Sequence, residues 1–231
     1  MKRLLGKALH ALGYEIRRIA PTTDLTPAAP IPGIPDFEQL AQAAATIPSM
    51  VGRQTAFALY LLCYLQELAG DVVEIGSWQG YSTSFLAKAV RDSGNGTIYA
   101  IDHFRGNFGK EQLYVVGRPD LSDLRRGFEN NLRRLGLWEV VHLLDMPNDE
   151  AIQRLDGVKV RLLFIDGDHT REGVEKDIRL FLPLVIPGGL VLFDDFAPHF
   201  HGLVEAVDLL IATQEFARVF SFHNTLVLRR Q

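Results

Sequence analysis

The sequence predicts an α/β fold in which a mostly parallel sheet carries helices on both faces and ends in an antiparallel hairpin. Between residues 71 and 212, short apolar runs of strand length alternate with segments whose apolar residues recur at helical spacing. Such alternation is typical of βαβ units, whose strands run parallel. The tail EFARVFSFHNTLVLRR instead places two strands around a short turn at His223, which predicts the hairpin.

The elements follow in order along the chain. Asp36 is placed to cap a helix over FEQLAQAAATI, and a second helix is predicted from Val51 to Leu68. Strands are expected at 71–75, 97–102, 139–144, 160–165, 189–194, 215–221 and 224–229. Helices between them are expected near 80–92, 121–135, 148–155, 171–181 and 202–212. Ligands of open sheets bind beyond the carboxyl ends of the parallel strands, so the site is expected there.

The first 35 residues differ from the rest of the chain. Residues 1–20 carry apolar residues at helical spacing between lysines and arginines, which predicts an amphipathic basic helix. This helix could contact an anionic membrane surface, its own domain or a second copy of the chain, and the last arrangement would make a homo-oligomer. Residues 21–35 hold five of the eleven prolines and predict a semi-extended linker. The domain proper is expected to span 36–231.

Composition excludes several classes of protein. With 231 residues the chain can bury one sizeable core, and a net charge of −4 with a pI of about 6.0 gives no basic surface for nucleic acid. The apolar run 56–65 is only half of the ~20 residues that a membrane span needs. One cysteine, Cys63, excludes an intramolecular disulfide and fits a reducing compartment. No secretory signal is recognised, so a cytoplasmic protein with no integral membrane segment is expected.

A glycine-containing turn, EIGSWQGYST, joins the first predicted strand of the sheet to a helix. Gly76 can adopt the turn conformation, and Gly80 would let the backbone approach a ligand where the helix begins. Amides at that helix start, with the hydroxyls of Ser82 and Thr83, would face an anion such as a carboxylate. Trp78 occupies the place of the second glycine in dinucleotide fingerprints, which disfavours a pyrophosphate and an NAD-linked oxidoreductase.

Two acidic residues narrow the choice of ligand. Glu74 would repel a pyrophosphate at the strand end but attract an ammonium or sulfonium group. Asp102 ends the strand TIYAID, where folds of this kind place the acid that binds the two ribose hydroxyls. S-adenosyl-L-methionine combines a ribose, a carboxylate, an ammonium and a sulfonium, and it is the ligand that these positions predict.

These segments carry a family resemblance. VVEIGSWQGYSTSFLA and IYAIDHF resemble the first two motifs of class I S-adenosylmethionine-dependent methyltransferases. LLFIDGDHTREGVEKDIRLFLPLVIPGGLVLFDDF resembles the small bacterial sugar and natural-product O-methyltransferases and, more loosely, catechol O-methyltransferase. The resemblance covers roughly residues 50 to 212. It implies a Rossmann-like sheet of seven strands with the last one antiparallel, and a saccharide or other small-molecule acceptor.

The resemblance and the turn together assign a cofactor site at the strand ends. Asp145 and Met146 resemble the adenine-side turn of the family, although a core or turn role is the alternative for them. His103, with the loop from 105 to 120, is also assigned to a lid over the substrate. The expected cofactor-binding residues are Glu74, Gly76, Ser77, Gly80, Ser82, Asp102, His103, Asp145, Met146 and Asp166.

Four carboxylates gather after two neighbouring strands, as Asp166 and Asp168 in FIDGDHT and as Asp194 and Asp195 in LFDDF. So many close negative charges need a counter-charge, and oxygen ligands suit Mg²⁺ or another divalent cation. The resemblance implies Asp166, Asp194 and Asp195 as the metal ligands. Catechol-type enzymes have asparagine at the position of Asp195, so the aspartate in this chain favours a likeness to the sugar O-methyltransferases.

Methyl transfer to oxygen requires that the acceptor hydroxyl lose its proton. A metal ion lowers the pKa of the hydroxyl, and a nearby base takes the proton. Asp168 matches the base of the sugar enzymes, while His169 falls where catechol-type enzymes keep a lysine, and imidazole titrates near neutrality. Asp168 or Thr170 could instead only cap the following helix.

Two alternative functions are possible, and the first of them explains fewer of these residues. A metal-dependent hydrolase would employ the Asp and His cluster to activate water, but it leaves Glu74, the glycine turn and Asp102 without a function. A non-enzymatic protein that keeps the S-adenosylmethionine fold is a further alternative.

Overall fold

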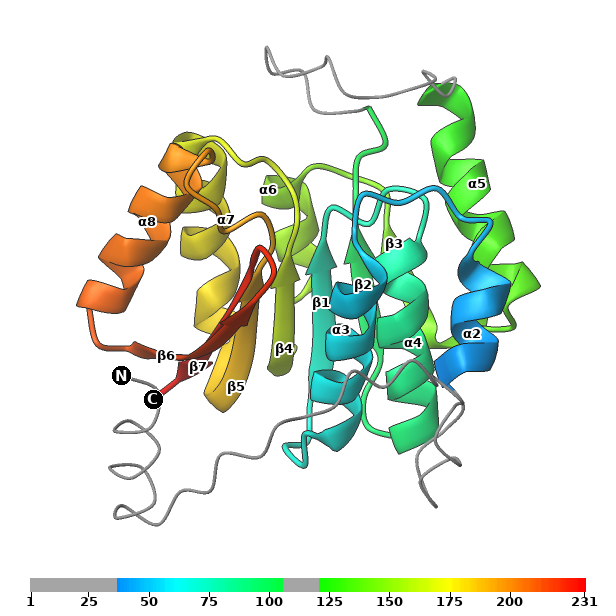
Figure 1. Ribbon diagram of the computed structural model, residues 1–231, viewed down its shortest axis with the longest axis horizontal. Helices are drawn as coiled ribbons and strands as arrows, with labels where there is room; N and C mark the ends of the chain where they lie inside the picture. Colours follow the sequence, from blue (N-terminus) through cyan, green and yellow to red (C-terminus); the bar gives the residue numbers. More distant parts are fainter. Residues whose placement is uncertain (1–36, 106–120) are drawn as a thin grey trace, which may run out of the picture. The chain divides into compact units, whose positions relative to one another are not determined.

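The computed structural model describes residues 37–105 and 121–231, and these form a seven-stranded sheet in the order β3-β2-β1-β4-β5-β7-β6 (Figure 1). The predicted basic helix, the linker and nearly all of the predicted lid lie outside the described residues. The strands are β1 Asp71–Ile75, β2 Ile98–Ile101, β3 Val141–Leu144, β4 Val160–Ile165, β5 Val185–Phe193, β6 Phe216–Phe222 and β7 Thr225–Arg230.

The α-helices match the predicted order, with short 3₁₀ turns between some of them. They are α2 Phe37–Ala44, α3 Arg53–Leu65, α4 Tyr81–Ser93, α5 Leu121–Arg134, α6 Asn148–Ala151, α7 Arg171–Phe181 and α8 His201–Ala212. The 3₁₀ turns are η2 Trp138–Val140, η3 Ile152–Arg154 and η4 Leu182–Leu184. The helix expected at 148–155 is therefore one short α-helical turn followed by η3. Strand β5 starts four residues earlier than expected, because Val185 pairs with Val160 across an irregularity in the register.

The pairing of the strands brings the predicted site to one edge of the sheet. Strand β1 runs parallel to β2 and β4, and β3 and β5 extend the parallel part on either side. Strand β7 runs antiparallel to both β5 and β6. The carboxyl ends of β1 to β5 therefore meet along one edge, and the predicted fold class is confirmed.

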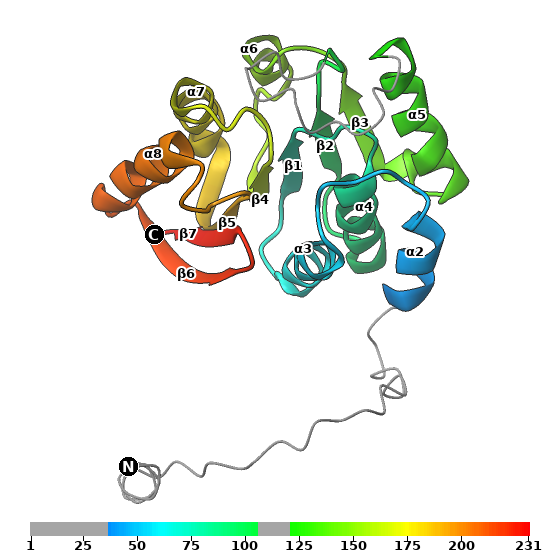
Figure 2. The same cartoon turned by 45° about the horizontal axis from the view of Figure 1, so that its top comes forward.

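Helices cover both faces of the sheet, and each face has its own core (Figure 2). One core packs α2, α3, α4 and α5 against side chains such as Val72 and Phe164, and the other packs α6, α7 and α8 against side chains such as Val73 and Ile165. Successive strand residues thus point to opposite faces, as they must in an extended chain. None of the helices in the described ranges is long and apolar enough to cross a membrane.

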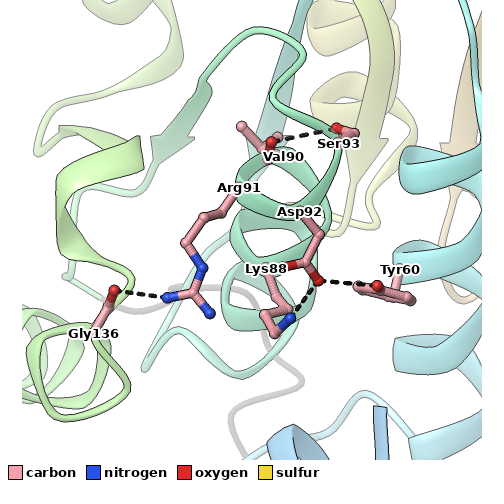
Figure 3. A network of polar contacts seen from close by, with 7 residues as sticks. All are labelled: Tyr60, Lys88, Val90, Arg91, Asp92, Ser93 and Gly136. Atoms are coloured by element: carbon pink, nitrogen blue, oxygen red, sulfur yellow. Dashed lines mark hydrogen bonds and ion pairs between the residues drawn. The ribbon is translucent and has the colours of Figure 1, made fainter. Parts of the chain in front are cut away.

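Polar contacts fix α4, the helix that begins at the glycine turn (Figure 3). The hydroxyl of Tyr60 on α3 donates a hydrogen bond to Asp92 Oδ2 at 3.0 Å, and Lys88 pairs with the same carboxylate. Burial and the neighbouring Asp92 carboxylate raise the pKa of Tyr60 well above its usual value. Arg91 Nη1 donates to the carbonyl of Gly136 at 3.0 Å, which ties α4 to the turn after α5. These bonds hold the carboxyl-terminal half of α4 against α3 and against the turn after α5.

A buried arginine lies near the amino ends of the parallel strands, at the edge of the sheet opposite to the predicted site. Arg161 on β4 is fully buried and donates to the carbonyls of Cys63 at 2.6 Å, Gly70 at 3.0 Å and Asn95 at 3.1 Å. Cys63 is also fully buried, and burial raises the pKa of its thiol to about 11. The guanidinium therefore joins the end of α3 to the loops before β1 and β2.

Candidate functional site

The glycine turn packs directly on the end of β4. Gly76 has a φ of +88°, and a Cβ placed on it would lie 1.9 Å from the carbonyl oxygen of Asp166. No side chain fits there, so glycine is required for both conformation and space. Gly80 has a φ of +84° and caps α4, but a Cβ on it would meet Phe128 and Leu132 of α5 at 3.0 and 3.1 Å. The absence of a side chain at Gly80 thus allows α5 to pack closely, and the approach of a ligand to its backbone stays a prediction.

Beneath the turn, Glu74 is fully buried at the end of β1. Its Oε2 accepts a hydrogen bond from the Thr83 hydroxyl at 2.5 Å. Within the described ranges, Glu74 Oε1 and the hydroxyl of Ser77 are buried without a hydrogen-bond partner. Burial raises the pKa of Glu74 to about 7, and nearby hydroxyls, that of Ser82 foremost, oppose the rise. Buried polar atoms are normally paired, so these two indicate that a ligand group belongs beside them.

Asp102 at the end of β2 has a structural function that sequence reasoning missed. Its Oδ2 accepts the backbone N–H of Trp78 at 2.8 Å, and its Oδ1 accepts that of Phe104 at 2.6 Å. Trp78 has a φ of +41°, and the Asp102 carboxylate holds its amide in this unusual conformation. A carboxylate oxygen has two lone pairs, so each keeps one for a ribose hydroxyl. His103 follows directly, and its Nδ1 accepts the N–H of Arg105 at 3.0 Å.

The residues after β3 divide between solvent and core. Asp145 forms an ion pair with Arg125 of α5, with 2.9 Å between Oδ2 and Nε, and the two side chains are largely exposed. Met146 forms a tight turn through its N–H to the carbonyl of Leu144 at 2.9 Å, and its side chain packs on the core beneath α6. The side chain of Met146 therefore has the core role that was the alternative to binding adenine, whereas the side chain of Asp145 is exposed.

At the ends of β4 and β5 the structure gathers Asp166, His169 and Asp195, which offer ligand atoms within 4.8 Å of one another. Nε2 of His169 lies 3.5 Å from Asp166 Oδ1, and Nδ1 lies 3.5 Å from Asp195 Oδ2. Burial raises the pKa of Asp166 to about 7, which His169 opposes and the neighbouring carboxylates increase. Burial alone would lower the pKa of His169, but the carboxylates raise it overall. Such a cluster favours a cation.

The other two aspartates of the expected cluster have different partners. Asp194 is buried, and its Oδ1 accepts a hydrogen bond from the Thr225 hydroxyl on β7 at 2.5 Å. Asp168 is exposed and accepts the N–H of Thr170 at 2.9 Å. Thr170 in turn caps α7 through the N–H of Gly173 at 3.1 Å, as one of the alternatives predicted. The structure thus groups His169 with Asp166 and Asp195 and gives Asp194 a bond to the hairpin.

A cavity of about 190 Å³ opens beside this cluster, and sequence reasoning did not anticipate it. Its wall combines the segment before and at the start of α3, the end of β5 and the turn of the β6–β7 hairpin. Two of the lining residues, Asp195 and His223, have a positive φ, of +54° and +45°. The lining residues are Met50, Gly52, Gln54, Thr55, Asp194, Asp195, His223 and Asn224.

Comparison with known proteins places this geometry in context. The model of the family described as a methyltransferase domain matches residues 73–196, which is more than half of the chain. An uncharacterized protein R132 of Acanthamoeba polyphaga mimivirus is 27% identical over 129 residues, which are 54% of this chain and 50% of that protein. The chain thus spans about half the length of this curated relative.

Solved structures share the fold at low sequence identity. The O-methyltransferase NovP has a TM-score of 0.64 at 20% identity, with 79% of this chain and 82% of that chain covered. An O-methyltransferase from Bacillus cereus in complex with SAH has a TM-score of 0.61 at 18% identity, covering 85% and 93%. The O-methyltransferase TomG from Streptomyces achromogenes, in complex with SAM, has a TM-score of 0.59 at 18% identity, covering 84% and 89%.

Proposed function

We infer the function from the family: the chain belongs to the methyltransferase domain family, and the predicted resemblance to class I S-adenosylmethionine-dependent methyltransferases is confirmed. We propose that it transfers the methyl group to a hydroxyl of a saccharide or another small, hydroxyl-rich acceptor, with assistance from a divalent cation. The likeness to NovP, TomG and the Bacillus cereus enzyme supports transfer to oxygen, because all three are described as O-methyltransferases.

The observation that supports the donor site is that two buried oxygens, Glu74 Oε1 and Ser77 Oγ, have no hydrogen-bond partner among the described residues. Both are oxygens, and an ammonium group has three N–H donors for them. Asp102 keeps one acceptor position on each oxygen for the ribose hydroxyls. When bound, S-adenosylmethionine supplies an electrophilic methyl group on its sulfonium. The residues present therefore fit the donor that the family uses.

Asp166 and Asp195 would hold the cation, with His169 as the third ligand in place of Asp194. A bound divalent ion would lower the pKa of a coordinated hydroxyl. The two carboxylates suit Mg²⁺ or Mn²⁺, whereas the imidazole favours a softer divalent ion than Mg²⁺. With His169 occupied, Asp168 is the group left to accept the hydroxyl proton. It is exposed and only two residues from Asp166.

The acceptor would lie in the cavity beside Asp195. Asp195 belongs to both the cavity wall and the acidic cluster, so a hydroxyl held in the cavity can reach the cation. Gln54, Thr55, His223 and Asn224 give the wall hydrogen-bonding side chains. A planar aromatic acceptor would gain little from such a wall, whereas a hydroxyl-rich one can pair with it.

Three titrations and an activity screen test the proposal. Adenosylhomocysteine is titrated calorimetrically into the wild type, into Asp102→Asn and into the control Asp123→Asn, whose carboxylate forms an exposed ion pair with Arg126 on α5. We expect binding in the wild type and the control and weakened binding in Asp102→Asn. The screen then measures release of adenosylhomocysteine with saccharides and with catechol, with Mg²⁺ or EDTA.

Absence of binding to the wild type would refute the donor site, and turnover of catechol but not of saccharides would refute the acceptor class. The hydrolase alternative is not favoured, because it gives Glu74 and Asp102 no function. A contact between copies through residues 1–20 and a cytoplasmic location stay predictions of the sequence.

A further inference from the structure

A carboxylate lies in the core at a place where packing alone would call for an apolar residue. Asp177 is on the face of α7 that packs against the sheet, with Val174 and Phe181 on the same face, and it is 1% exposed. Burial raises the pKa of Asp177 to about 6, which a hydrogen bond from Asn148 opposes. A buried carboxylate is costly unless its oxygens are well paired, so its contacts indicate what it does.

The two oxygens of Asp177 face two different loops. Oδ1 accepts a hydrogen bond from the side-chain amide of Asn148 at 2.6 Å, and Asn148 is the first residue of α6. Oδ2 lies 3.5 Å from the position that a Cβ on Gly167 would take. Gly167 is also in contact with the glycine turn, because a Cβ on Gly76 would lie 3.1 Å from its Cα. Gly76, Gly167, Asp177 and Asn148 thus form one continuous line of contacts.

This line of contacts joins three segments that carry the candidate site. Gly76 begins the turn above Glu74, and Gly167 lies between Asp166 and Asp168. Asn148 follows the turn at Asp145 and Met146 and starts the helix behind the sheet, where α6 and α7 lie side by side (Figures 1 and 2). A hydrogen bond to a charged acceptor is stronger than one between neutral groups, so this bond can fix α6 against α7.

We propose that Asp177 is a positioning residue of the donor site, which acts through Asn148 and Gly167 to keep the turn after β3 and the loop after β4 in register with the glycine turn. This inference rests on the proposed function, because it takes the donor to bind across those loops. Asp177 itself is buried beneath them and does not contact the ligand.

An exchange of the two side chains tests the proposal. The probe is adenosylhomocysteine, titrated calorimetrically into the full chain at a temperature where circular dichroism shows each variant folded. In Asn148→Asp two carboxylates would face each other, and we expect affinity to fall roughly tenfold. Asp177→Asn keeps a weaker, neutral bond and should lose about threefold. The double variant restores an amide and a carboxylate, with the acid at a helix start, and should return to within about twofold of the wild type.

Lys176→Met is the matched control. Lys176 joins the same two helices through an exposed pair with Asp149, with 2.9 Å between Nζ and Oδ1. We expect this variant to bind adenosylhomocysteine as the wild type does. If Asp177→Asn does not fold, Asn148→Ala takes its place in the series. This substitution removes the amide at a half-buried position.

The outcomes separate the two proposals. A wild type that does not bind adenosylhomocysteine refutes the proposed donor site itself. If the wild type binds and the single variants bind equally well while only their melting temperatures fall, Asp177 is a structural residue and the inference is wrong. Weak binding by the single variants without recovery in the double variant also overturns the inference. The bond between Asp177 and Asn148 would then not explain the loss of affinity.

Discussion

Replacement of Gly76 by alanine tests the central contact of the site, the packing of the glycine turn on β4. The added Cβ would lie 1.9 Å from the carbonyl oxygen of Asp166 and 2.6 Å from its carbonyl carbon. Both are backbone atoms at the end of a buried strand, so neither can move aside like a flexible side chain. The φ of +88° adds strain of its own. Gly94 is a matched control, since its φ is +62° and a Cβ there meets nothing within 4 Å.

The magnitudes of the two substitutions should differ by the steric contribution alone. A left-handed conformation costs an alanine about 1 kcal/mol, and this applies to both positions. Overpacking in a well-packed region adds about 1 to 3 kcal/mol at Gly76 only. For a domain of this size 1 kcal/mol corresponds to about 2 to 4 °C in melting temperature. We therefore expect a loss of about 3 °C for Gly94→Ala and about 6 to 12 °C for Gly76→Ala.

The assay pairs thermal unfolding with calorimetric titration of adenosylhomocysteine below the melting temperature of each variant. Gly76→Ala should also lose binding, because relief of the contact displaces the turn above Glu74 or the chain at Asp166. Gly94→Ala lies at the far end of α4 and should bind normally. Equal stability and equal binding in the two variants would refute the packing argument.

Three further predictions concern separate parts of the molecule. Arg161→Met leaves three buried carbonyls without their donor and should lower the free energy of unfolding in urea by at least ~2 kcal/mol, and an unchanged value would contradict this. The pKa of Glu74, about 7 in the folded protein, lies above its ordinary value, so its contribution to stability is present at low pH and is lost as the pH rises through 7. The free energy of unfolding of Glu74→Gln, relative to that of the wild type, should therefore rise by up to about 3 kcal/mol between pH 4 and pH 8. An identical pH dependence of the two proteins would contradict this. EDTA or Asp195→Asn should suppress methyl transfer to the acceptor but leave the affinity for adenosylhomocysteine within about twofold, and turnover without the metal would exclude the proposed cation.

The sequence predicted the parts of the fold that depend on local pattern. Apolar strands such as 160–165 and the glycine turn are visible in short windows, because burial on both faces and a positive φ each impose a residue type. The position of Asp102 at a strand end was also predictable. Its two backbone hydrogen bonds were not, since the bond to Trp78 joins residues 24 apart in the sequence.

Contacts between distant segments explain most of what the sequence left unpredicted. Arg161 interrupts an apolar strand, and its acceptors lie 91, 98 and 66 residues away. The cavity joins the start of α3 to the hairpin turn at His223, at opposite ends of the domain sequence. Neither position shows an unusual local pattern, so only the assembled fold reveals that they meet.

The acidic pair Asp194 and Asp195 shows that neighbours in the sequence can have different partners in the fold. Consecutive residues at the end of a strand point to opposite sides, so two adjacent carboxylates do not converge on one ion by default. Asp194 continues the strand and bonds to Thr225, while the φ of +54° at Asp195 turns its carboxylate toward Asp166. His169 joins the cluster from the loop between β4 and α7. The grouping of Asp166, His169 and Asp195 thus follows from where each strand ends and how its loop turns, which the spacing of aspartates does not encode.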